Sequence, residues 1–234
     1  MTERVVLVTG GNRGIGRSIA EEFIKQGHKV AVTVRSGEGP TGSLSVKADV
    51  TDPASLDAAF AEIEEKLGPV EILVANAGIT RDGTFMKMSR DDWSAVIDTN
   101  LNSLFYVTKQ VIPGMVEQGW GRIINISSVN GQKGQFGQTN YSTAKAGLRG
   151  FTMALAQEVA SKGVTVNTVS PGYIGTDMVR AIRPDVLEKI VSTIPVKRLG
   201  TPEEIASICA WLASDESGFS TGADFSLNGG LHMG

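Results

Sequence analysis

Short apolar stretches alternate with longer amphipathic stretches along the whole chain. The apolar stretches are rich in Val and Ile, and they predict strands near residues 5–9, 29–34, 44–47, 71–75, 122–126, 164–169 and 224–227. Between them, apolar residues recur at helical spacing and predict a helix that opens at the glycine-rich residues 10–16, helices over 53–67, 90–116 and 140–161, and a last helix from 202. This alternation predicts an α/β fold with a doubly wound parallel sheet that carries helices on both faces.

The alternation breaks after the sixth predicted strand. Residues 176–198 are mostly polar, with one short helix expected near 185–192. We expect the segment from about 175 to 200 to be a flap over the strand ends. No stretch has the composition of a linker, so we expect residues 1–234 to form a single domain.

Composition narrows the possible functions. Charged residues make up 20% and the net charge is −3, which gives no reason to expect nucleic acid or a membrane surface as partner. One cysteine and two histidines allow neither an internal disulfide nor a clustered metal site. The chain begins without a signal-peptide pattern and has no apolar run that would span a bilayer, so we expect a cytoplasmic protein.

The residues whose side chains are best suited to catalysis lie between 127 and 145. Tyr141 and Lys145 stand four apart, and a helix that Asn140 caps would place both on one face. A neighbouring ammonium favours the phenolate, which would suit Tyr141 to general acid or base work. Ser128, at the end of a strand, would then hydrogen-bond the oxygen that takes up the proton. Taken alone, such a pair is commonplace and is usually not catalytic.

A glycine loop joins the first strand to its helix with the pattern Thr-Gly-x-x-x-Gly-x-Gly over residues 9–16. Glycines let a backbone approach a pyrophosphate, and the helix that follows offers free N–H groups. A purely structural glycine turn is the alternative. The loop residues that we expect to bind a cofactor are Gly10, Asn12, Arg13, Gly14, Ile15 and Gly16.

The residue that ends the second strand bears on the choice of cofactor. An acidic residue there would accept from the ribose hydroxyls of NAD, whereas Arg35 would attract the 2′-phosphate of NADP. Arg13 would reach the same place, although both arginines are also compatible with a solvated surface. Asp49, after the third strand, would accept from the adenine amino group or serve as an ordinary turn residue. We expect NADPH/NADP+, with Val50 beside Asp49 in the same site.

Several motifs together resemble the short-chain dehydrogenase/reductase family, in the right order and over the whole chain. They are the glycine loop, Asn76-Ala77-Gly78, Asn100, Ser128, Tyr141-x-x-x-Lys145 and Pro171-Gly172. The resemblance implies a Rossmann-type fold and a catalytic tetrad of Asn100, Ser128, Tyr141 and Lys145.

Each member of the tetrad receives a role from the resemblance. Tyr141 would protonate a carbonyl oxygen as hydride arrives from the nicotinamide, while Ser128 orients that carbonyl. Lys145 would lower the tyrosine pKa and hold the nicotinamide ribose, and Asn100 would hold a proton-relay water. Residues 76–78 would pack on the adenosine ribose. Pro171, Gly172, Ile174 and Thr176 complete the expected cofactor site, the last two meeting the carboxamide. Ser127 is the competing serine, but position 128 matches the family spacing.

Two groups within the family match different parts of the chain. Residues 78–234 resemble bacterial acetoacetyl-CoA reductases of polyhydroxybutyrate synthesis, whereas residues 1–77 resemble actinobacterial 3-oxoacyl-carrier-protein reductases of fatty acid biosynthesis. The chain is therefore either chimeric or a natural intermediate. Both groups imply NADPH-dependent reduction of a 3-oxoacyl thioester to the (R)-3-hydroxy product. Gln135, Phe136, Gln138 and Tyr173 are the candidates to close around the acyl group.

The substrate carrier and the assembly are further expectations. The turn before the fifth strand, residues 117–120, has no basic residue to dock an acidic carrier protein, which favours acyl-CoA over acyl carrier protein. The small residues of the helix after Tyr141 and the family resemblance imply a homotetramer. A ketone, sugar or steroid oxidoreductase and a noncatalytic NADP-binding module are the alternative functions.

Overall fold

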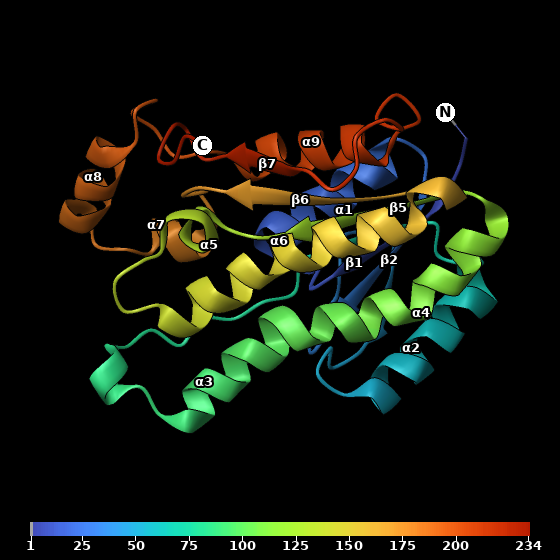
Figure 1. Cartoon of the computed structure of the whole chain (residues 1–234), viewed down its shortest axis with the longest axis horizontal. Helices are drawn as coiled ribbons and strands as arrows, with labels where there is room; N and C mark the ends of the chain where they lie inside the picture. The colour runs from blue at the N-terminus through green and yellow to red at the C-terminus, as the bar shows by residue number, and fades with distance from the viewer. Residues whose placement is uncertain (1) are drawn as a thin grey trace.

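Seven strands form one parallel sheet at the centre of the molecule (Figure 1). The computed structural model describes residues 2–234. The strands are β1 Val5–Thr9, β2 Lys29–Val34, β3 Ser43–Lys47, β4 Ile72–Ala75, β5 Gly121–Ile126, β6 Val164–Pro171 and β7 Asp224–Leu227. Their order is β3-β2-β1-β4-β5-β6-β7, so the chain winds outward from β1 in both directions. The predicted doubly wound sheet is confirmed, and the switch in direction lies between β1 and β4, where such sheets bind ligands.

Helices cover both faces of the sheet. Helices α1 (Gly14–Lys25) and α9 (Pro202–Ala213) pack on one face, and α2 (Pro53–Leu67), α4 (Ser103–Gln118) and α6 (Thr139–Val159) pack on the other (Figure 1). Strand β1 is fully buried, and its alternate residues divide between the two cores: Leu7 packs with the α2 layer, and Val6 with the α1 layer. Burial on both faces explains why the strands read as continuous apolar runs.

The helix expected over 90–116 is not regular. Helix α3 (Arg90–Ile97) and α4 are separated by a π-helical turn, η2 (Asp98–Asn102). Asn100 in this turn is 3% exposed, and its Nδ2 donates to the carbonyls of Val96 at 2.8 Å and Ile79 at 2.9 Å. The side chain thus competes with the helix for a backbone acceptor, which is the local reason for an Asn at this position.

Two other local expectations are corrected around the catalytic candidates. Helix α6 begins at Thr139, so Asn140 lies in its first turn and does not cap it. Instead, the buried Asn140 Nδ2 donates to the carbonyl of Arg81 at 3.0 Å. A five-residue helix, α5 (Val129–Lys133), follows Ser128 directly and was not predicted. One turn of helix is too short to produce a periodic pattern in the sequence.

The flap segment contains two short helices between β6 and α9, at the end of the molecule where β6 and β7 finish (Figure 1). They are α7 (Asp177–Arg180) and α8 (Pro184–Thr193), of which only the second was expected. Single 3₁₀ turns, η1 (Phe85–Lys87) and η3 (Ala160–Lys162), complete the helical elements of the described residues. Within residues 2–234, no helix is long and apolar enough to cross a membrane.

Candidate active site

The glycine loop between β1 and α1 is shaped for close backbone approach. Gly10 and Gly14 have φ values of +64° and +53°, a region that glycine occupies without strain. A Cβ atom at Gly16 would lie 2.4 Å from Asn76 Nδ2, so a larger residue would clash. Arg13 precedes α1 in an extended conformation and makes no side-chain cap hydrogen bond. The first N–H groups of α1 therefore have no side-chain cap at Arg13, and this arrangement fits the pyrophosphate of a dinucleotide.

The end of β4 is fastened to this loop by hydrogen bonds. The Thr9 Oγ1 atom accepts from the backbone N–H of Asn76 at 2.9 Å and of Ala77 at 3.0 Å. Asn76 Nδ2 donates to the Thr9 carbonyl at 2.9 Å. A Cβ at Gly78 would meet Asn100 Oδ1 at 2.5 Å and Lys145 Nζ at 3.6 Å. Residues 76–78 thus connect the glycine loop to two members of the expected tetrad.

The residues expected to bind the adenosine part of the cofactor are exposed to solvent beside the glycine loop. Arg13 and Arg35 are exposed, and Asn12 Nδ2 donates to the Ser36 carbonyl at 3.0 Å. That bond ties the glycine loop to the segment after β2. Both arginines therefore lie on segments that meet beside the loop.

Asp49 has local partners in addition to any ligand. Its Oδ1 accepts from the backbone N–H of Thr51 at 2.9 Å and from Thr51 Oγ1 at 2.7 Å. These hydrogen bonds and the charge of Arg35 hold the Asp49 pKa below its usual value. Val50 beside it is buried and lines a small cavity together with Asn100 and Lys145.

Tyr141 and Lys145 share one face of α6, as their spacing predicts. Lys145 Nζ lies 5.7 Å from the centre of the Tyr141 ring. Lys145 is 4% exposed and donates to the Ile126 carbonyl at 2.7 Å. Burial lowers the pKa of Lys145 to about 8, because the charged form loses solvation.

The pKa of Tyr141 moves in the direction opposite to the expected one. Burial raises it, the side-chain hydrogen bond with Ser128 lowers it, and the nearby charge of Asp82 raises it further. Burial makes the largest contribution to this shift, and the Lys145 ammonium donates to the Ile126 carbonyl. The geometry thus keeps the phenol protonated, the form that a proton donor needs.

The two neighbouring serines have different surroundings. Ser127 is buried, and its Oγ donates to the Lys145 carbonyl at 2.8 Å. This hydrogen bond joins α6 to the end of β5. Ser128 is the N-cap of α5, and its Oγ accepts from the Asn130 N–H at 3.1 Å. The Ser128 side chain also lies close enough to the Tyr141 phenol to lower the tyrosine pKa. This geometry favours Ser128 as the partner of the phenol.

The expected substrate-side residues lie on the segment between α5 and α6 and after β6. Gln138 Oε1 accepts from Asn130 Nδ2 at 3.0 Å, and Gln138 Nε2 donates to Asp82 Oδ2 at 2.9 Å. Gln135 accepts from Lys133 Nζ at 2.8 Å. Phe136 is 87% exposed. Sequence reasoning missed Asp82, since an acidic residue in a polar loop carries no signal of the phenol that it faces.

The segment after β6 closes on the glycine loop. The Gly172 N–H donates to the Leu227 carbonyl at 2.9 Å, and a Cβ at Gly172 would lie 2.7 Å from the Asn228 Cα. Ile174 is buried, while Thr176 Cγ2 lies 3.5 Å from the Cβ position of Gly14. The expected carboxamide residues and the expected pyrophosphate loop are thus in contact. Pro171 is the last residue of β6, which continues two residues beyond its predicted end.

A cavity of about 640 Å³ lies between α9, β7 and the end of the flap. Its lining includes Gly172, Tyr173 and Ile174 of the expected cofactor and substrate segment, together with Trp211, but none of the four tetrad candidates. Among the described residues, no group of three or more His, Cys, Asp or Glu side chains is placed to hold a metal ion.

Comparisons with known proteins agree with this geometry. A family model described as "Enoyl-(Acyl carrier protein) reductase" matches residues 10–232. An acetoacetyl-CoA reductase of Cupriavidus necator is 64% identical over 250 residues, covering 100% of both chains. An acetoacetyl-CoA reductase of Allochromatium vinosum is 53% identical over 98% of this chain and 99% of the relative. A 3-oxoacyl-[acyl-carrier-protein] reductase, FabG, of Salmonella typhimurium is 47% identical over 98% of each chain.

The names of these relatives differ in the acyl carrier, which is coenzyme A or acyl carrier protein. All three are reductases, and each match covers nearly the whole of both chains. The resemblance to acetoacetyl-CoA and 3-oxoacyl-carrier-protein reductases is confirmed, and the match to the Cupriavidus necator enzyme covers residues 1–77 as well as the rest of the chain. The sheet order, the glycine loop and these similarities lead to one conclusion: the chain is an enzyme that belongs to the short-chain dehydrogenase/reductase family, whose members use a nicotinamide cofactor.

Proposed function

We propose that this enzyme reduces acetoacetyl-CoA, a 3-oxoacyl thioester, to the (R)-3-hydroxyacyl thioester with NADPH. The observation that carries the proposal is the half-buried side chain of Tyr141, whose pKa responds to the Ser128 hydroxyl and whose ring centre lies 5.7 Å from Lys145 Nζ. The 64% identity to an acetoacetyl-CoA reductase over the whole chain supports this choice of substrate.

The chain supplies a proton and holds the substrate carbonyl. The Tyr141 hydroxyl gives its proton to the carbonyl oxygen, and Ser128 donates a hydrogen bond to that same oxygen. The phenolate left on Tyr141 is then stabilised by Ser128 and by the Lys145 ammonium. The nicotinamide, when bound, supplies the hydride that the carbonyl carbon receives. Asn100 would hold a water on the route by which the proton is replaced. Its proximity to Gly78, which Lys145 also approaches, supports this role.

The cofactor is held by the glycine loop, by residues 76–78 and by the segment from Pro171 to Thr176. Backbone N–H groups of α1 meet the pyrophosphate, and Arg13 and Arg35 meet the 2′-phosphate. The exposure of both arginines beside the loop supports NADPH over NADH.

Coenzyme A is the carrier that we favour. The end of α4 and the turn before β5 expose Glu117, Gln118 and Gly119, none of which is basic, and this acidic segment would repel an acidic carrier protein. The 47% identity to a carrier-protein reductase makes 3-oxoacyl-[acyl-carrier-protein] reduction the second candidate. Gln135, Phe136, Gln138 and Tyr173 would contact the acyl group in either case. A noncatalytic NADP-binding module would not need the proton-donor site.

The substrate assignment is tested by following NADPH oxidation with acetoacetyl-CoA, with the same acyl group on a carrier protein, and with simple ketones. We expect turnover with NADPH and the CoA thioester to exceed the other combinations. Equal or faster turnover on the carrier protein would replace the first candidate with the second. A preference for simple ketones over both thioesters would contradict the proposed substrate class.

Tyr141→Phe removes the proton donor and leaves the ring. We expect kcat to fall by a factor on the order of 100 to 10,000, because no other acid replaces the phenol. Binding of NADPH, measured by its fluorescence, should change little. Tyr106→Phe, at a half-buried position on α4, is the matched control and should retain activity. Full activity of Tyr141→Phe would show that another group donates the proton.

Arg35→Asp tests the choice between the two cofactors. Replacing a cation with an anion beside the 2′-phosphate should lower kcat/KM with NADPH and raise the NADH-to-NADPH ratio by roughly a factor of ten or more. Lys29→Asp makes the same charge change at the opposite, exposed end of β2 and should leave the ratio unchanged. An unaltered ratio in Arg35→Asp would exclude Arg35 as the phosphate ligand.

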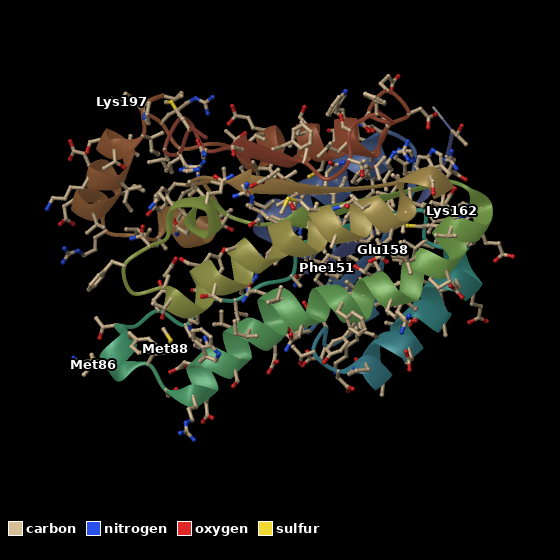
Figure 2. All side chains as sticks on the ribbon, in the orientation of Figure 1. Met86, Met88, Phe151, Glu158, Lys162 and Lys197 are labelled. Carbon is tan, nitrogen blue, oxygen red and sulfur yellow. The ribbon has the colours of Figure 1, made fainter. Side chains whose placement is uncertain are left out.

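A homotetramer is the expected assembly. Apolar side chains remain exposed on the outer helices, including Phe105 of α4 and Met153 of α6, and Phe151 and Glu158 lie on the same outer layer (Figure 2). Burial of this layer against a second copy would remove apolar surface from water. Light scattering should therefore give the mass of four chains, and the mass of one chain would refute this proposal.

A further inference from the structure

The carboxylate of Asp224, at the start of β7, is bonded by three different elements. Its side chain is 10% exposed. Ser170 Oγ of β6 lies 2.7 Å from Oδ1, while Gln132 Nε2 of α5 and Arg149 Nε of α6 lie 2.9 Å and 3.1 Å from Oδ2. A nearly buried carboxylate with three donors is well compensated, so these contacts hold its position firmly.

Each of the three partners lies next to residues of the catalytic or cofactor site. Ser170 immediately precedes Pro171-Gly172. Gln132 is in the short helix that Ser128 caps. Arg149 follows Lys145 by four residues, one turn farther along α6. One carboxylate therefore joins the segments that carry Ser128, the Tyr141–Lys145 pair and the expected carboxamide site.

Helices α5 and α6 behave as one packed body. A Cβ at Gly131 would lie 2.8 Å from the carbonyl carbon of Lys145, so the two backbones are in direct contact. Ser127, just before α5, adds its hydrogen bond to the Lys145 carbonyl. Because α5 is only five residues long, it cannot hold its own orientation and depends on such contacts.

The side-chain amide of Gln132 connects the α5–α6 body to β7. Its Nε2 donates to Asp224 Oδ2 and, at 2.7 Å, to Ser226 Oγ of β7, whereas its buried Oε1 has no hydrogen-bond partner. The Gln132 amide therefore ties α5 to Asp224 and Ser226 of β7 at the same time.

We propose that Asp224 is a positioning residue, whose carboxylate holds the α5–α6 body on the β6–β7 edge and thereby sets the contact between Ser128 and Tyr141. Asp224 itself touches neither substrate nor cofactor in this assignment. The inference deepens the proposed function, because it concerns the alignment of the same proton-donor site. Arg149 is about half exposed, so Gln132 and Ser170 supply the stronger links.

The test is Asp224→Asn, which keeps the volume and removes the charge. Loss of alignment should lower kcat roughly tenfold while KM for NADPH stays within about a factor of two, since the glycine loop is untouched. A second readout needs no substrate: the phenolate absorbance of Tyr141, isolated by subtracting the titration of the same variant carrying Tyr141→Phe. Because the Ser128 bond lowers the Tyr141 pKa, its loosening should move this ionisation to higher pH.

Asp57→Asn is the matched control, since this carboxylate also accepts from a glutamine, Gln110, but between α2 and α4. It should leave both readouts unchanged. If Asp224→Asn does not fold, Gln132→Met and Arg149→Met each remove one link and should each lower kcat, Gln132→Met the more.

Folded variants with unchanged kcat and an unchanged phenol ionisation would overturn the positioning role. So would a loss of thermal stability with no change in either readout. A parent enzyme without thioester turnover, in which Asp224→Asn still moves the Tyr141 ionisation, would contradict the proposed substrate and uphold the positioning role.

Discussion

The buried ammonium of Lys145 is the constraint on which the site depends. A lysine that is 4% exposed must find a hydrogen-bond partner inside the protein, and the Ile126 carbonyl at the end of β5 supplies it. This bond fixes α6 against the sheet at the point where strand and helix both carry site residues. A Cβ at Gly131 would lie 2.8 Å from the carbonyl carbon of Lys145, and a Cβ at Gly78 would lie 2.5 Å from Asn100 Oδ1. The close packing around Lys145 and Asn100 therefore requires glycine at both positions.

The same constraint shapes the electrostatics of the phenol. Tyr141 shares the helix face with Lys145, but the ammonium faces a carbonyl and burial dominates the tyrosine pKa. The site thus holds a protonated phenol, and the side chain of Ser128 is the group that favours its ionisation. A site arranged in this way favours proton donation to an oxygen that arrives between Ser128 and Tyr141. The alignment of these two residues is consequently the quantity that the surrounding hydrogen bonds must control.

Hydrogen bonds at the strand ends turn separate motifs into one surface. Thr9 links the glycine loop to the end of β4, and Gly172 lies against the backbone of Asn228 after β7. Thr176 reaches Gly14 across the switch point between β1 and β4. These contacts join residues that lie between 56 and 162 positions apart, and each uses a small side chain or a hydroxyl group whose role is not visible in the local sequence.

The sequence by itself determined the sheet, the helices that cover it and the candidate residues. Apolar periodicity is a local property, and the motifs are short, so both can be read without a structure. The interruption of the helix at Asn100, the helix start at Thr139 and the short α5 depended on tertiary contacts, because buried amides there bond to distant carbonyls. Only the tertiary structure decided that Asp82 faces the phenol and that Asp224 joins α5, α6 and β6. Such pairings depend on which elements pack together, and no spacing along the chain encodes them.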